Sequence, residues 1–399
     1  MAHAGQHCTK AVASDSLEAS ATRLEVIEGP RVLDDLSTLL DELHAATATP
    51  VTARRPWLQT WLSCFCDYQP LAFVLRMENR LGAAALLAQR RRLGITEIVA
   101  LGHGPSDQTR FPCRTADAAV ALSRGIASHL LSRPGPWRLV VRHLPMHDPV
   151  AIALRGELPR AVLMDGEVSP TLRFGHDRGL RGYVSRNHYQ QVRRMTNRME
   201  REHLAPEFDH LHEASTVASV LPELEEVCRK RDAMMRRRSQ LDDPSFGAFF
   251  RRVILEHAER GEVELTTLRL EGELAAYVLC FVDNGSYRMW NCRFAPKWAH
   301  LGPGRVANNQ AVEHALTEGG CSEFDWMLGD EGYKSSMANH LEPSQDLLAW
   351  SSPTLRAILD SPRRLLLTLK GLKDRHEPLE RAWNATKQAS QRIRWGSQS

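Results

Sequence analysis

The chain has 399 residues, of which 43% are hydrophobic and 25% are charged, values typical of a globular protein of two domains. The net charge of +3 is too small to indicate DNA binding by the chain as a whole. No apolar run approaches the roughly 20 residues of a membrane-spanning helix, and no signal-peptide core is visible. The eight cysteines lack zinc-ligand spacing, which predicts reduced thiols in a cytoplasmic protein with no metal site.

The first part of the chain is read mainly from its helix signals. Residues 1–21 are small and polar, which predicts disorder. Residues 33–46 have the apolar period of an amphipathic helix. Pro56 suits the first turn of a second helix, on which Trp57 and Trp61 share an apolar stripe. These tryptophans fit a hydrophobic core, with stacking on a ligand as the alternative.

A β-hairpin pattern occurs twice. Residues 71–89 predict two strands around a tight polar turn, and residues 75–87 align without a gap on residues 268–280. Leucine, arginine, glutamate and alanine recur at the same positions, which predicts two related domains. The alternative is chance, because many hairpins share such a pattern.

A loop of small and polar residues follows a predicted strand over residues 95–101. It covers residues 102–107 and ends in Asp107, which either contacts the acceptor substrate or caps a turn. Glycines over residues 175–182 indicate a domain boundary. We therefore expect domains over residues 22–170 and 183–350, followed by a helical tail over 353–399.

Two basic clusters lie beyond this boundary. The predicted helix over residues 187–203 carries four arginines, and residues 229–238 carry two further basic triplets. Solvated helix faces explain most such clusters. The alternative is a polyanionic ligand such as coenzyme A or a transfer RNA.

Residues 263–334 read as strand, hairpin turn, strand, turn, strand, glycine loop, helix and buried strand. The loop Gly302-Pro303-Gly304 opens the helix, and Arg305 follows it. A helix start of this kind binds phosphate through its free N–H groups. In the last strand, Phe324 and Trp326 share one face and Asp325 has the other.

This order, with Phe324-Asp325 and the Gly-Asp-Glu-Gly-Tyr-Lys segment over residues 329–334, resembles the GNAT-type acyltransferase domain of bacterial cellulose-biosynthesis CelD-like proteins. Those are similar in turn to the Fem aminoacyltransferases. The resemblance covers most of residues 50–350. It implies an α/β (α+β) fold of tandem GNAT-like domains, each a mixed twisted sheet flanked by helices. It also implies a splayed pair of parallel strands, to which we assign residues 274–282, with a main-chain N–H for the thioester carbonyl.

The resemblance and the residue chemistry together give a set of candidate site residues. A carboxylate is needed as general base, a hydroxyl can protonate the leaving thiolate, and a lysine can neutralise a carboxylate or phosphate of the substrate. The catalytic candidates are Asp325, Asp330, Glu331 and Tyr333. The donor-binding candidates are Gly302, Pro303, Gly304, Arg305 and Val306. The acceptor-binding candidates are Lys334, Tyr277, Trp290, Asn291 and Asp107.

The expected function is therefore that of an N-acyltransferase. It would move an acyl group, expected to be acetyl, from acyl-coenzyme A to an amine of a small molecule, sugar or amino acid by direct attack. One alternative is a Fem-like enzyme that uses aminoacyl-tRNA. The other is a non-catalytic module in polysaccharide or envelope assembly.

Overall fold

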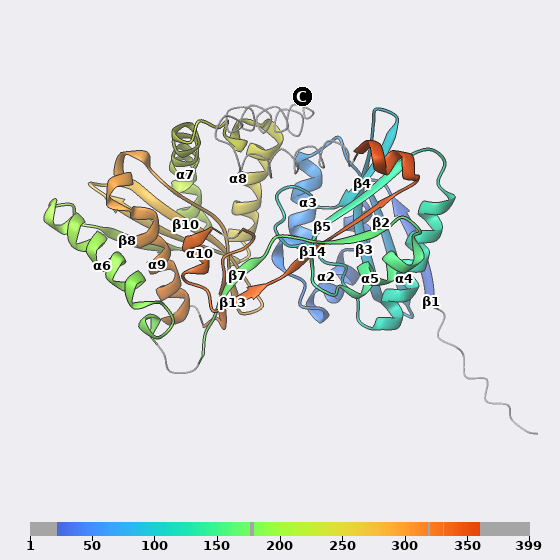
Figure 1. Cartoon of the computed structure of the whole chain (residues 1–399), viewed down its shortest axis with the longest axis horizontal. Helices are drawn as coiled ribbons and strands as arrows, with labels where there is room; N and C mark the ends of the chain where they lie inside the picture. The colour runs from blue at the N-terminus through green and yellow to red at the C-terminus, as the bar shows by residue number, and fades with distance from the viewer. Residues whose placement is uncertain (1–21, 176–178, 318–319, 330, 360–399) are drawn as a thin grey trace, which may run out of the picture.

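The computed structural model describes residues 22–175, 179–317, 320–329 and 331–359, which form two α/β lobes side by side (Figure 1). The predicted disordered segment 1–21, the candidate Asp330 and residues 360–399 of the predicted tail lie outside this description. Residues 353–359 are helical. None of the described helices is both long and apolar enough to cross a lipid bilayer.

The first lobe is built on a mixed sheet with the strand order β1-β2-β3-β4-β5-β14-β6. Its strands are β1 (Thr22–Glu28), β2 (Gln69–Met77), β3 (Arg80–Arg92), β4 (Ile95–Ala100), β5 (Trp137–Pro145), β6 (Val162–Asp165) and β14 (Ser344–Trp350). Its helices are α1 (Val32–Asp35), α2 (Ser37–Ala46), η1 (Val51–Ala53), α3 (Arg55–Cys64), α4 (Ala116–Ser132) and α5 (Pro149–Glu157). The helix expected over residues 33–46 is thus divided at Leu36, which caps both α1 and α2.

The second lobe is built on a sheet with the order β13-β7-β12-β11-β10-β9-β8. Its strands are β7 (Ser169–Arg173), β8 (Glu207–Leu211), β9 (Val263–Leu270), β10 (Glu273–Asp283), β11 (Ser286–Phe294), β12 (Glu323–Asp325) and β13 (His340–Glu342). Its helices are η2 (Leu180–Gly182), α6 (Arg186–Arg201), α7 (Ala214–Met234), η3 (Gln240–Asp242), α8 (Pro244–Ala258), η4 (Pro296–Leu301), α9 (Pro303–Thr317) and α10 (Gly332–Ser335).

The two sheets have the same topology. Counted from β1 and from β8, both begin with antiparallel pairings between the first four strands, and the fourth and fifth strands are parallel. One helix, α4 or α9, connects the parallel strands in each lobe. The repeated hairpin is β2–β3 in the first sheet and β9–β10 in the second. The predicted duplication is therefore confirmed.

The repeat extends to an irregularity within the hairpins. In each copy the register shifts by one residue close to the turn, because one residue of the second strand is left without a partner. The pairs that flank this bulge are Leu75 with Ala83 and Arg76 with Leu81 in the first copy, and Leu268 with Ala276 and Arg269 with Leu274 in the second. The turn glutamates Glu78 and Glu271 both have positive φ, 57° and 52°.

The lobes exchange strands where the chain crosses between them. Strand β7 follows β6 in sequence but pairs with β12 and β13 in the second sheet, whereas β14 returns to pair with β5 and β6 in the first. Figure 1 shows β14 running from the centre of the molecule into the first lobe. This differs from the expected domains, which placed residues 344–350 in the second domain and residue 169 in the first.

The interface between the lobes is an aromatic core. Trp57 of α3 is fully buried, and its ring lies 5.3 Å from Phe249 of α8, 5.2 Å from Phe281 of β10 and 5.4 Å from Trp290 of β11 between ring centroids. Trp61 is also fully buried. The core interpretation of these tryptophans therefore holds, and one hydrophobic cluster continues through both lobes.

Candidate active site between the two domains

The loop over residues 102–107 is held by tryptophan N–H groups from both lobes. Trp57 Nε1 donates to Ser106 Oγ over 2.8 Å, and Trp61 Nε1 donates to the His103 carbonyl over 3.1 Å. From the second lobe, Trp290 Nε1 donates to the Pro105 carbonyl over 3.1 Å. Indole N–H groups seek such partners when they are buried. Their three bonds fix the position of the residue that ends the loop, Asp107.

Asp107 lines a cavity of about 330 Å³ between the lobes. Burial raises the pKa of this half-buried carboxyl to about 7, and the negative charges of Asp325, Glu167 and Glu331 add to the increase, while Lys334 opposes it. A carboxyl that titrates near neutrality inside a cleft is suited to general-base catalysis. The structure therefore brings a residue of the first lobe to the charged groups of the second.

Asp325 lies beside this cavity but is buried, and it accepts hydrogen bonds at every available position. Its Oδ1 accepts from Ser169 Oγ and the Met327 N–H, each over 2.8 Å, and its Oδ2 accepts from Gln108 Nε2 over 2.6 Å and Arg288 Nη1 over 2.9 Å. A carboxylate has about four acceptor positions. The face opposite Phe324 and Trp326 is thus an interface between lobes, which strand alternation alone did not reveal.

The polar network continues from Arg288 into the first lobe. Arg288 Nε donates to Asp283 Oδ1 over 2.6 Å, and Asp283 Oδ2 accepts from the Val51 N–H over 2.5 Å. Arg54 Nη2 lies 3.6 Å from the same oxygen. Gln108, Ser169 and Arg288 were not predicted as site residues, because their spacing in the sequence does not indicate that all three bind Asp325. Together these groups hold the two lobes in one orientation around the cavity.

Three further candidates, Glu331, Tyr333 and Lys334, lie in the short segment that ends with α10. Lys334 is buried, and its Nζ donates to the Leu328 carbonyl over 2.6 Å and lies 2.9 Å from Glu331 Oε2. Tyr333 Oη lies 3.6 Å from Cys292 Sγ. Burial, with the nearby Cys292, raises the pKa of Tyr333 well above its usual range, so its hydroxyl keeps its proton at neutral pH.

The parallel pair of the second sheet is β11 and β12, which corrects the expectation that residues 274–282 form one member. Strand β10 is antiparallel to both of its neighbours. Strands β11 and β12 pair only over residues 286–288 and 323–325, and β11 then continues to Phe294 paired with β10 on its other side. The two strands therefore separate beyond Arg288.

The predicted donor-binding residues stand at the start of α9. Gly302 has a φ of 67°, which favours glycine, and a Cβ on Gly304 would lie 3.1 Å from Phe294. Pro303 and Val306 are buried, and the Arg305 guanidinium donates to Gln191 of α6. The α9 start is thus packed between α6 and the end of β11.

The remaining acceptor-binding candidates do not line the interdomain cavity. Tyr277 is almost completely buried and donates to Asn291 Oδ1 over 2.8 Å, while Cys228 of α7 lies 2.7 Å from the tyrosine oxygen. Trp290 donates a hydrogen bond to the Pro105 carbonyl and so holds the loop that ends in Asp107. Asp107 and Asp325 therefore line the same cavity, Lys334 acts on Asp107 through its charge without lining that cavity, and Tyr277 and Asn291 lie apart from it.

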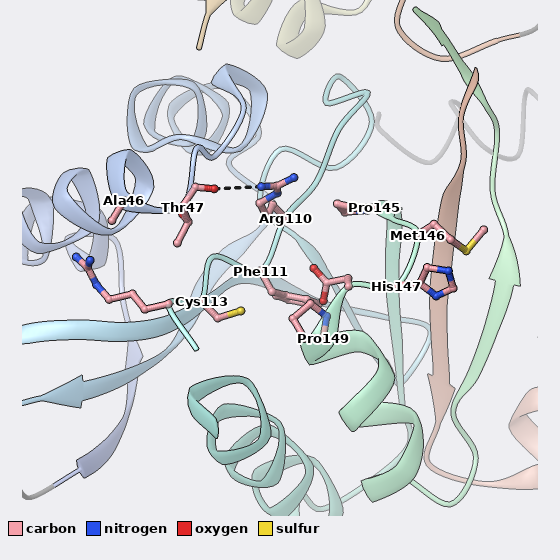
Figure 2. Close-up of a pocket in the computed structure, with 11 residues that line it drawn as sticks. Ala46, Thr47, Arg110, Phe111, Cys113, Pro145, Met146, His147 and Pro149 are labelled. Atoms are coloured by element: carbon pink, nitrogen blue, oxygen red, sulfur yellow. Dashed lines mark hydrogen bonds between the residues drawn. The ribbon is translucent and has the colours of Figure 1, made fainter. Parts of the chain in front are cut away.

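A larger cavity of about 440 Å³ lies in the first lobe (Figure 2). It is lined by Arg110, Cys113 and Asp148, and Arg110 Nη1 donates to the Thr47 carbonyl over 3.1 Å. Burial raises the pKa of Asp148 to about 6 although its carboxylate caps α5. The Asp148-Pro149 pair is a helix-start signal that could have located this residue in the sequence.

The first lobe fills the place where its own parallel strands would separate. The Thr109 N–H donates to the His143 carbonyl of β5 over 3.0 Å, and the Ala84 N–H of β3 donates to the Pro112 carbonyl over 2.9 Å. Residues 109–114 thus lie between the ends of β3 and β5.

Although the cavity of the first lobe is larger, the interdomain cavity contains the converging charged groups, and we take it as the candidate site.

Comparison with known proteins agrees with this architecture. Residues 186–335 match the acetyltransferase (GNAT) domain family. The fold is similar to that of FemX, with a TM-score of 0.60, 9% identity and coverage of 80% of this chain and 98% of that one. It is also similar to the C-terminal domain of a putative lysylphosphatidylglycerol synthetase from Agrobacterium fabrum, with a TM-score of 0.51, 12% identity and coverage of 82% and 94%. No curated protein matches the sequence. The match to the acetyltransferase (GNAT) domain family therefore covers residues 186–335, within a two-domain fold similar to that of FemX.

Proposed function

We propose that the protein is an N-acyltransferase that moves an acyl group from acyl-coenzyme A to an amine bound in the interdomain cavity. The observation that carries this proposal is the position of Asp107, whose carboxyl lies in that cavity with a pKa of about 7. The same cavity is lined by Glu323, Asp325 and Glu342 and by the guanidinium groups of Arg110 and Arg288.

In the proposed reaction, Asp107 takes a proton from the bound ammonium group, and the neutral amine attacks the thioester carbonyl. The C–N bond forms as the carbonyl becomes a tetrahedral oxyanion, whose nitrogen still carries the second amine proton. The C–S bond then breaks, and this second proton passes to the thiolate, which leaves as the free thiol of coenzyme A. Tyr333, which keeps its proton at neutral pH because burial raises its pKa, donates a hydrogen bond to the departing sulfur. Lys334 stabilises the ionised form of Asp107.

Release of free coenzyme A tests this proposal directly. The full chain is mixed with acetyl-coenzyme A and a panel of small amines, amino sugars and amino acids, and free coenzyme A is followed with a thiol reagent. We expect release that depends on the amine and yields the acylated product by mass spectrometry. The proposal would be contradicted if the chain bound no coenzyme A and released none with any amine. That result would favour a non-catalytic module in polysaccharide or envelope assembly.

A second candidate is transfer from aminoacyl-tRNA, favoured by the exposed arginines of α6. Arg193, Arg194 and Arg201 are exposed on this helix, which packs against the start of α9. Such a surface suits the phosphates of a nucleic acid. Binding of labelled tRNA that falls steeply with salt, together with no turnover of acyl-coenzyme A, would favour this donor. The resemblance of the sequence to CelD-like proteins goes with the first proposal, in which the donor is acyl-coenzyme A.

Replacing Gly304 with leucine is expected to raise the KM for the donor about tenfold or more, equivalent to about 1.4 kcal/mol, with the KM for the amine nearly unchanged. The reason is that both donors present phosphates, which bind best at a glycine-containing helix start. The matched control is Gly156→Leu in α5, where a Cβ meets nothing within 4 Å. Equal donor KM values for wild type and Gly304→Leu would place the phosphates elsewhere.

A further inference from the structure

Two histidines and a glutamate from distant parts of the chain meet on the α9 side of the second sheet. His210 lies on the edge strand β8, Glu264 on β9, and His314 in the last turn of α9. One potential ligand atom from each residue lies within 4.8 Å of those of the other two. His314 Nε2 is 3.2 Å from Glu264 Oε1, and the two imidazole rings stack with centroids 3.9 Å apart.

The sheet register explains why these side chains converge. His210 pairs directly with Thr266, so both point to the same face, and Glu264 lies two residues earlier on the same face of β9. Helix α9 packs against β9 and β10 and brings His314 onto this face. Thr266 Oγ1 lies 3.1 Å from His210 Nδ1 and helps to orient the ring.

We propose that His210, Glu264 and His314 form a binding site for a divalent transition metal, with Zn²⁺ as the best match. Two imidazole nitrogens and one carboxylate oxygen are a common zinc ligand set, and a water molecule can complete a tetrahedron. With bonds of about 2.0–2.1 Å, the ligand atoms of a tetrahedron are about 3.3 Å apart. The separation of 3.2 Å between His314 and Glu264 matches this spacing, and the stacked rings of His210 and His314, which are 12° from parallel, would turn so that one nitrogen of each points to the ion.

The site has a structural consequence for the proposed donor site. The metal would join the last turn of α9 to strands β8 and β9, while the first turn of the same helix carries Gly304. None of the three ligands lines the interdomain cavity. The metal is therefore inferred to hold α9 in place and to take no part in the chemistry, and this inference stands whichever donor the protein uses.

Cobalt and zinc titrations test the proposal without an activity assay. The full chain is freed of metal with a chelator and titrated with Co²⁺, whose visible absorption reports its coordination, and then with Zn²⁺ by calorimetry. We expect one site per chain with a Kd in the micromolar range or below, displacement of Co²⁺ by Zn²⁺, and a higher unfolding midpoint with Zn²⁺ than with chelator.

Variants assign the site. His314→Ala, His210→Gln and Glu264→Gln should each weaken metal binding at least tenfold and abolish the increase in unfolding midpoint. His300→Ala is the matched control, because His300 is an exposed histidine just before the other end of α9. No tight binding by the wild type, or equal binding by all four variants, would overturn the proposal. His210 is half-buried on an edge strand, so its variant is expected to fold and to decide the matter if the others do not.

Discussion

Replacing Asp107 with asparagine is expected to lower kcat/KM for acyl transfer by about 10²–10⁴-fold, the usual contribution of a general base. Asparagine has nearly the same shape and leaves the three tryptophan bonds to the loop in place, because those bonds reach Ser106, Pro105 and His103. Donor affinity should therefore stay within about twofold of the wild type. Steady-state kinetics with a saturating donor measure the effect, and full activity in this variant would remove Asp107 from the mechanism.

The pH dependence gives Asp107 a second signature. Because the base must be ionised, kcat/KM of the wild type should rise with pH and level off above the pKa of about 7. The folded state also binds this proton more tightly than the unfolded chain does, so the free energy of unfolding should fall as pH rises from about 4 to about 7. Asp107→Asn should lose the rise in activity and should be more stable than the wild type at pH 8.

Asp148 provides the matched control in the other cavity. Its pKa is also raised, to about 6, and asparagine is as good a helix cap as aspartate. Asp148→Asn should therefore keep both the activity and its pH profile. A large loss of activity in this variant, with Asp107→Asn unaffected, would move the active site to the first lobe.

Replacing Asp325 with asparagine is expected to destabilise the fold by about 3–5 kcal/mol, the usual cost of removing one partner from a buried ion pair. The side chain of Asp325 is 4% exposed and that of Arg288 is 11% exposed. The variant would remove the carboxylate at Arg288 Nη1, leave Arg288 with its bond to Asp283, and turn an amide N–H₂ toward existing donors. Chemical denaturation measures the loss, and activity should fall because the lobes no longer hold the cavity in shape.

A double-mutant cycle separates this structural role from a catalytic one. Asp325→Leu combined with Arg288→Met removes both charges, and it should recover part of the stability that Asp325→Leu alone loses. If Asp325 were instead the general base, Asp325→Asn would lose turnover while its unfolding free energy stayed within about 0.5 kcal/mol of the wild type. That result would return Asp325 to the role that strand alternation suggested.

The local features of the fold were predictable because they depend on residues close together in sequence. The hairpin over residues 263–283 follows from alternating apolar residues around Glu271-Gly272, and the start of α9 follows from Gly302-Pro303. The duplication was visible for the same reason, since both hairpins repeat one short pattern. Each of these elements obtains its hydrogen bonds from within a few turns or from the adjacent strand.

The candidate site was decided by contacts that no local pattern encodes. Gln108 and Asp325 are 217 residues apart, and their hydrogen bond exists only because the loop over residues 102–107 crosses to the second lobe. Alternation showed that Asp325 points away from Phe324, but it did not show that the opposite face is buried against the other lobe. In the same way, β14 follows the second domain in sequence but completes the first sheet.

The proposed metal site also depends on contacts between residues that are far apart in the sequence. The sequence predicted no metal site because His210, Glu264 and His314 lie far apart and match no zinc spacing. Pairing of β8 with β9 brings the first two residues to one face, and packing of α9 adds the third. Propensity and periodicity act between neighbouring residues, and they were enough to predict hairpins such as β9–β10 and the start of α9. Which polar side chains meet depends on how strands pair and helices pack over long separations, and it therefore became visible only in the folded chain.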